Sequence, residues 1–415
     1  MSTSQKRLSR KKLRPLFINR DYLFAHSPNG ECLRSFMGGM SKEEWDPFVY
    51  GSDKQPLVTH LDYEFRLTHE KRYVQYLAAL VRRVLIPDLT WLPGYEWQAW
   101  GKAAAKRIIK DIKSGIVSPD YIHSISYPVA SHWATLQVKR ATGLPWVMQL
   151  YDPWADNPYR PFKKDYFKKK DWEMEALAAK EADLIIHTNE KIAALWRERY
   201  GEEISRKIIV LPLTIPIPKV EVSPIRHSPD EPIVISHIGN FMLNRRAEPF
   251  VGALSKLLCM HPEFRSRIKV NFIGTVPDED KRLIEEEDLS EIITLHGTLP
   301  IEQCEPFYKE SDLFLVIDGI NPDNIFFPSK ILKYFYFRRP ILGITPNGSV
   351  LDDELKASQH SCYDNRDIDG IVDYLNTAVT NYSALCNFSA DYWKKFEPSA
   401  VVDSYKDAVM KMIAI

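Results

Sequence analysis

The sequence has no excess charge of either sign and few cysteines. Its 415 residues include 55 basic and 55 acidic side chains, so the chain lacks the broad basic field that nucleic-acid binding requires. We therefore expect no nucleic-acid partner. The chain holds five cysteines, none spaced as CxxC, which argues against a disulfide framework and against a cysteine zinc site. A reducing, cytoplasmic setting is the expectation.

Long apolar runs are also missing. The basic N-terminal stretch is followed by only a few apolar residues before Asn19, which is too short for the apolar region of a signal peptide. No segment approaches the roughly 20 apolar residues needed to cross a bilayer. We expect a protein that is soluble or that at most lies on a membrane surface.

Two clusters of basic residues leave two interpretations open. Lys6–Arg14 contains six basic side chains, and Lys163–Lys170 contains five beside Trp172. The plainer interpretation is solvated surface. The functional one is peripheral contact with the anionic inner face of a membrane, worth about 1 kcal/mol per basic residue near the surface.

Short β-type segments alternate with amphipathic helices in two successive series, the pattern of parallel α/β sheets. At this length two domains are the natural expectation. Six prolines between Pro212 and Pro232 favour an extended linker. We predict an N-terminal domain over 1–212, a linker over 213–232, a second domain over 233–390, and a C-terminal helix over 391–415 that packs back on the first domain. The predicted strands lie at Pro15–Ile18, Tyr121–Ser124, Trp146–Leu150, Leu184–His187, Ile208–Leu211, Ile233–Ser236, Val270–Ile273, Ile292–Leu295, Leu313–Val316 and Pro340–Gly343.

Two Rossmann-like domains predict a cleft between two sets of strand carboxyl ends, where ligands of open α/β sheets bind. The strongest chemical segment for this site is Phe326–Ser349. Within it Pro328 and Ser329 begin a helix, whose free N–H groups and positive dipole end make an anion site. Lys330 in the first turn adds a full charge, although a surface lysine is the equally weighted alternative.

A second segment runs from a strand through Gly239 into a loop and a helix. Glycine permits close approach of the backbone to a phosphate, and Arg245 offers paired donors to phosphate oxygens. A simple tight turn is the alternative. In the first half, His132 near a helix start and Asp152 at a strand end are placed to face the cleft. By itself, His132 is more often structural, and Trp154 is more often a core residue.

Five segments in order resemble the family 4 glycosyltransferases, particularly bacterial members that build surface polysaccharides. They cover roughly residues 120 to 350 and read ISYPVASHW, TGLPWVMQLYDPWADNPY, EADLIIHTNE, HIGNFMLNRRAEPF and FFPSKILKYFYFRRPILGITPNGS.

The resemblance implies a GT-B architecture that transfers a sugar, with retention of configuration, from a nucleotide diphosphate to a polysaccharide or lipid-linked glycan. It implies no essential metal and no cofactor. Acceptor recognition falls mainly in the N-terminal domain and donor binding in the C-terminal one. The residues that match the family's motifs are Arg245, Lys330 and His132 for catalysis, Gly239, Asn240, Ser329, Gly348, Ser349 and Asp323 for the donor, and Asp152 and Trp154 on the acceptor side.

One departure from the family pattern concerns the nucleoside. Relatives carry an acidic residue just before the tyrosine of the PSK segment, where this chain has Lys333, and another where it has Ile325. Lysine cannot accept hydrogen bonds from ribose hydroxyls, so Asp318 or Asp323 is the expected substitute. The departure keeps a non-catalytic GT-B partner open as the alternative function, and an epimerase as a third. The identity of the donor, the acceptor, the linkage and the oligomeric state lies beyond the sequence.

Overall fold

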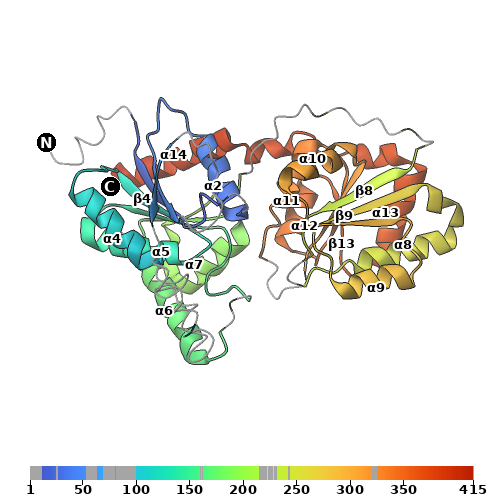
Figure 1. Cartoon of the computed structure of the whole chain (residues 1–415), viewed down its shortest axis with the longest axis horizontal. Coiled ribbons are helices and arrows are strands. Elements are labelled where there is room, and N and C mark those ends of the chain that lie inside the picture. Colours follow the sequence, from blue (N-terminus) through green and yellow to red (C-terminus); the bar gives the residue numbers. More distant parts are fainter. Residues whose placement is uncertain are drawn as a thin grey trace. The chain divides into compact units, whose positions relative to one another are not determined.

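The computed structural model describes residues 12–24, 27–52, 63–68, 80, 100–158, 160, 162–214, 222, 228, 231–241, 244–319 and 325–414. The chain divides into two compact units, Met1–Pro216 with Lys395–Ile415, and Ile217–Lys394. The division after Pro216 falls inside the predicted linker, most of which lies outside the described residues. Each unit contains one parallel sheet with its helices (Figure 1). No helix of the described ranges is both long and apolar enough to span a bilayer.

The first unit holds seven parallel strands in the order β3-β2-β1-β4-β5-β6-β7. The central strands β1, β4 and β5 are buried along their whole length, as expected where helices cover both sides of a parallel sheet, although β4 and β5 include polar residues. Strand order reverses between β1 and β4, which makes that pair the topological switch point. The strands are β1 Pro15–Ile18, β2 Phe48–Ser52, β3 Glu64–Thr68, β4 Tyr121–Ser126, β5 Trp146–Leu150, β6 Leu184–His187 and β7 Ile208–Val210.

Two helices of the first unit begin at side-chain caps. The Asn189 side chain accepts from the N–H of Ile192 at 3.0 Å and starts α7, and Ser27 accepts from the N–H of Gly30 to start α2. The helices are α2 Pro28–Gly38, α4 Trp100–Lys113, α5 Ala130–Thr142, α6 Asp165–Glu181, α7 Glu190–Ser205 and α14 Pro398–Ala414.

The C-terminal helix α14 belongs to the first unit and contacts α2. The Tyr405 hydroxyl lies 2.8 Å from the Tyr121 hydroxyl and 2.7 Å from Nδ1 of His123 on β4. At the start of the helix, a Cβ on Gly39 would lie 2.4 Å from the carbonyl of Pro398, so only glycine allows this approach. Buried hydrogen bonds and close backbone packing thus hold the end of the chain on the unit where the chain began.

The second unit holds six parallel strands in the order β10-β9-β8-β11-β12-β13, with the switch point between β8 and β11. Its strands are β8 Ile233–Ile238, β9 Ile268–Ile273, β10 Ile293–Gly297, β11 Leu313–Ile317, β12 Ile341–Ile344 and β13 Ser361–Tyr363. Its helices are α8 Glu248–Met260, α9 Asp278–Glu286, α10 Ile301–Glu310, α11 Lys330–Phe337, α12 Val350–Ala357 and α13 Ile368–Thr380, with 3₁₀ turns η3 Pro262–Ser266 and η4 Tyr382–Cys386, and η5 Tyr392–Phe396 at the division between the units.

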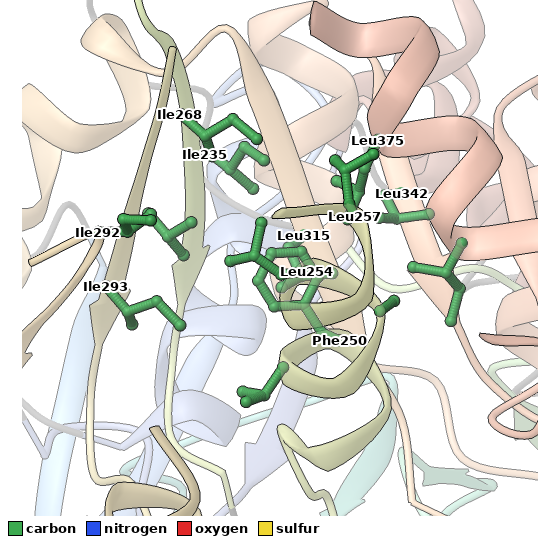
Figure 2. Close-up of a cluster of buried hydrophobic side chains, with 14 of the residues drawn as sticks. Ile235, Phe250, Leu254, Leu257, Ile268, Ile292, Ile293, Leu315, Leu342 and Leu375 are labelled. Carbon is green, nitrogen blue, oxygen red and sulfur yellow. The ribbon is translucent and has the colours of Figure 1, made fainter. Parts of the chain in front are cut away.

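One large apolar core lies against this second sheet. Figure 2 shows Phe250, Leu254 and Leu257 of α8 turned toward side chains of the strands, including Ile235 and Leu315. The three helical positions recur at four- and three-residue spacing, so one face of α8 is buried. This packing fixes the sheet beneath the carboxyl ends of β8 and β11.

The structure confirms two parallel α/β sheets and all ten predicted strands, with shifts of a residue or two at their ends. The prediction missed β2, β3 and β13. Two of these lie at a sheet edge, where apolar runs are shorter and burial is less complete.

Candidate functional site

The switch point of the second unit brings together the residues for which an anion site was predicted. β8 and β11 lie side by side, and the chain leaves them at Gly239 and Asp318 respectively. Because both strands are parallel, these residues lie at the same edge of the sheet. Open α/β sheets bind ligands at this edge.

The loop after β8 packs closely against the backbone of the loop after β9. Gly239 has a φ of 136° and Gly274, after β9, a φ of 124°. A Cβ on Gly274 would lie 2.6 Å from the carbonyl carbon of Gly239, so the two loops touch. Asn240 ties them further, because its Oδ1 accepts from the N–H of Thr275 at 2.8 Å. The predicted role of Asn240 at the phosphates stays a prediction, and its side chain has this structural role as well.

Lys330 lies across Gly239. A Cβ on Gly239 would be 3.0 Å from both Cε and Nζ of Lys330, so the glycine leaves the room that the lysine uses. Lys330 is the first residue of α11, and Ser329 caps that helix without a side-chain hydrogen bond. Among the described residues, the N–H groups of Ser329 and Lys330 donate to no other group. The helix start therefore presents two free N–H groups beside a lysine.

Arg245 is held beside this lysine. Its Nε donates to Oδ1 of Asp318 at 3.1 Å, and Asp318 is only 3% exposed. The Asp318 Oδ1 also accepts the N–H of Gly319 at 3.0 Å. Asp318 therefore orients the guanidinium, and its expected contact with ribose stays a prediction. The neighbouring Arg246 turns away to Asp280 and Glu279.

The charges at this site perturb one another. Burial lowers the pKa of the Lys330 ammonium to about 7, with a further contribution from Arg245 that Asp318 opposes. Arg245 and Lys330 are both partly buried, and a bound anion would offset the repulsion between their charges. Together with the free N–H groups of α11, these two cations are suited to bind a phosphate dianion and to stabilise negative charge that develops on it.

The other predicted donor residues lie elsewhere at this edge or outside the described ranges. Gly348 follows β12 with a φ of 70°, and its N–H donates to Asp352 at 2.8 Å. Ser349 is buried and caps α12, and its hydroxyl lies 2.9 Å from that of Thr345. Asp323 lies outside the described residues. Contact of Gly348 and Ser349 with a donor stays a prediction.

The chain departs from the family pattern at Ile325 and Lys333. Ile325 is a buried apolar residue, 4% exposed. Lys333 occupies the second turn of α11, one residue before Tyr334. The Tyr334 hydroxyl accepts the N–H of Ile238 at 2.8 Å, so the tyrosine ties α11 to the end of β8.

In the first unit, His132 and Trp154, both predicted site residues, lie side by side in the buried interior. Their rings stack at 5.6 Å, and the exposed fractions are 0% and 1%. His132 shares a hydrogen bond of 2.8 Å with Ser124, and burial lowers its pKa to about 3. Trp154 donates to Asp171 at 3.0 Å. Asp152 is partly exposed in the loop after β5, and the roles of all three residues in transfer or acceptor binding stay predictions.

No group of three or more His, Cys, Asp or Glu side chains in the described part of the chain is placed to hold a metal ion.

Comparison with known proteins gives one family match. A family model described as Glycosyltransferase Family 4 matches residues 58–217, almost wholly within the first unit. Over these residues the chain is similar to the family 4 glycosyltransferases. No curated protein sequence matches it.

Solved structures with the same fold match 96 to 97% of this chain. The lipopolysaccharide outer core galactosyltransferase WaaB matches with a TM-score of 0.62 and 13% identity, over 96% of this chain and 99% of that one. Anabaena HepE, solved with UDP and glucose, gives 0.66 and 11%, over 96% and 100%. Sucrose-phosphate synthase from Thermosynechococcus elongatus gives 0.67 and 12%, over 97% and 100%. The two Rossmann-like units are those of the GT-B fold.

Sequence reasoning missed the part that three residues play at the second unit's site. His237, with its Nε2 2.8 Å from Nζ of Lys330, lies on β8 two residues before Gly239. Gly274 follows β9, and Asp318 was named only as a ribose partner. The signal for Gly274 and Asp318 was available, since a glycine or an acid directly after an apolar strand is a frequent feature of α/β edges.

Proposed function

We propose that this chain is a glycosyltransferase, which transfers a sugar from a nucleoside-diphosphate donor, held by the second unit, to a glycan acceptor. One observation carries the proposal. Lys330 and Arg245 lie together at the carboxyl edge of the sheet, against the glycine loop and the N-terminus of α11. In this position they match the charge of a diphosphate leaving group.

In the transfer, the bond between the anomeric carbon and the donor's phosphate oxygen breaks. A bond forms from the anomeric carbon to an acceptor hydroxyl oxygen, and the hydroxyl proton passes to the departing diphosphate or to solvent. The charge that develops on the diphosphate is stabilised by Lys330, Arg245 and the α11 N–H groups. Such preorganised donors are each worth roughly 10² to 10³ in rate.

The donor class is tested by thermal unfolding with a panel of UDP, GDP, dTDP, ADP and their common sugars. A ligand at 100 times its dissociation constant adds about 2.7 kcal/mol of stability. Lys330→Met should lose the shift seen for one nucleotide family. Lys281→Met, which removes a surface lysine paired to Asp278, should keep it. If no nucleotide stabilises the wild type, the proposal fails.

The finer parts of the proposal are retention of anomeric configuration and a polysaccharide or lipid-linked glycan acceptor of cell-surface biosynthesis. The resemblance to family 4 members that build bacterial surface polysaccharides supports both. Proton NMR of the first product from a donor of known anomer tests the configuration. An inverted product would overturn it.

The third part is the membrane contact, from the cytoplasmic side. Basic residues Lys163, Lys164, Lys168 and Lys169 are exposed at the start of α6, next to Tyr166, which is 64% exposed. Trp172 faces Arg199 instead, whose guanidinium carbon lies 4.1 Å from the ring centroid. An exposed aromatic among lysines favours an anionic lipid surface.

The membrane contact is tested by sedimentation with vesicles of phosphatidylglycerol or phosphatidylcholine. Lys168→Glu with Lys169→Glu should reduce binding to the anionic vesicles alone. The matched control is Lys106→Glu with Lys110→Glu on α4, two other exposed lysines. Equal binding of both double variants would contradict the contact.

A further inference from the structure

His237 lies next to the lysine of the donor site. It is the fifth residue of β8 and is fully buried, 0% exposed. Its Nε2 lies 2.8 Å from Nζ of Lys330. The imidazole ring stacks on Phe241 with the ring centroids 4.1 Å apart at 21°, and Phe272 adds an edge contact at 6.2 Å. The ring is held by both phenylalanines, so its Nε2 has a fixed direction.

Lys330 uses one of its three N–H groups on this acceptor. No other acceptor for its ammonium is found among the described residues. Two N–H groups remain for other acceptors, and Nζ lies beside Gly239, where a Cβ would come within 3.0 Å of it. Arg245 lies nearby, held by Asp318.

We propose that His237 is a positioning residue for Lys330. The unprotonated Nε2 accepts one ammonium N–H and directs the other two toward the space beside Gly239, where the diphosphate binds. The inference rests on the proposed donor site. It adds the residue that orients the Lys330 ammonium group at that site.

Two effects on protonation agree with this geometry. Burial, then the charges of Lys330 and Arg245, keep the pKa of His237 well below its usual value, so the imidazole stays neutral and can accept. The pKa of Lys330 is lowered to about 7 by burial and by Arg245, and Asp318 opposes this. An imidazole that accepts from the ammonium stabilises its charged form. Removing the acceptor should therefore lower the pKa of Lys330 further.

Two variants separate positioning from packing. His237→Phe keeps an aromatic ring against Phe241 and removes the acceptor. His237→Gln places an amide oxygen near the former Nε2 and keeps an acceptor. We expect His237→Phe to shift the titration of Lys330 to lower pH, and to weaken nucleotide binding about tenfold or more at neutral pH. His237→Gln should restore most of both.

The titration is measured by NMR of protein carrying ¹³C at the lysine Cε, in the absence of any nucleotide. The wild type should show a Lys330 signal, identified by its loss in Lys330→Met, with a midpoint near 7. Nucleotide binding is then measured by calorimetry at several pH values with the panel above. A merely structural role would weaken binding without moving the midpoint.

The outcomes distinguish the two ideas. A midpoint that is unchanged in His237→Phe overturns the positioning role, whatever the nucleotide does. A shifted midpoint in a protein whose wild type binds no nucleotide overturns the donor function and leaves the proton coupling of the pair in place. A shifted midpoint with weakened nucleotide binding supports both.

Discussion

The guanidinium of Arg245 is anchored by the carboxylate of Asp318, with Nε 3.1 Å from Oδ1. The carboxylate is buried, so one side of the guanidinium is fixed and the other N–H groups keep a defined direction. Pairs of this kind hold a planar donor in place for a phosphate or a diphosphate.

We predict that Arg245→Ala lowers kcat by about 10² to 10³, because one preorganised cation is lost from the leaving-group site. Arg245→Lys should lower kcat less, because lysine keeps the positive charge, although it lacks the paired N–H donors of the guanidinium. Steady-state turnover, with a donor selected by the thermal-unfolding panel, measures both.

Arg246→Ala is the control, because this neighbouring arginine pairs with Asp280 and Glu279. It should keep turnover near the wild-type value. If the two alanine variants lose turnover equally, the assignment of Arg245 is wrong.

Gly239→Ala is predicted to weaken donor binding at least tenfold. Its φ of 136° is unfavourable for alanine, and the added methyl would lie 3.0 Å from Cε and Nζ of Lys330. Either the loop or the lysine must move. Calorimetric affinity for the nucleotide measures the effect.

The matched control is Gly252→Ala in the interior of α8, where a Cβ would meet nothing within 4 Å. It should leave affinity unchanged and stabilise the chain by up to about 1 kcal/mol. A Gly239→Ala protein with wild-type affinity would show that Lys330 does not need this room.

The apolar pattern of each strand explains whether it could be predicted from the sequence. The predicted strands are short segments rich in apolar residues, so composition and length identified them. β3, with alternating polar residues at an edge of the first sheet, and β13, with three half-buried residues, carry too little apolar pattern. The edge strand β10 was predicted, and its Ile293 belongs to the apolar core of the second sheet in Figure 2.

The candidate site was predictable in part for a related reason. Gly239, Arg245 and Lys330 lie in local patterns, a strand-loop-helix and a helix start, that can be recognised along the chain. Gly274 follows β9 and Asp318 follows β11. These strands lie beside β8 only because the strand order is β10-β9-β8-β11. His237 gave no signal at all, since a buried histidine in a strand looks like a core residue.

We predict that Tyr405→Phe destabilises the first unit by about 1 to 3 kcal/mol. The change removes the hydroxyl shared with Tyr121 and His123 and leaves two buried polar groups without this partner. Nine of the chain's ten tryptophans lie in residues 1–216, so tryptophan fluorescence during chemical denaturation follows this unit. Tyr166→Phe, at an exposed site, should change stability by less than about 0.5 kcal/mol. A Tyr405→Phe protein as stable as the wild type would contradict a role for this network.

The last prediction concerns a buried carboxyl group in the first unit. Burial is the main cause that raises the pKa of Glu175 to about 7. The Tyr200 hydroxyl donates to it at 2.5 Å, and the N–H of Ala155 at 2.7 Å. Because a folded pKa above the unfolded one favours the protonated form, its stabilising contribution is complete below about pH 4.5 and is lost as pH rises to about 7.

The wild type should therefore lose stability relative to Glu175→Gln across that window, by up to about 1.4 kcal/mol per pH unit. The measurement is the free energy of unfolding by tryptophan fluorescence at several pH values from 5 to 8, on both proteins. Glu181→Gln, in which a partly exposed carboxylate that pairs with Arg140 is changed, is the control and should show no such trend. A difference between wild type and Glu175→Gln that stays constant or grows with pH would contradict the raised pKa and would mean that Arg199 keeps Glu175 ionised.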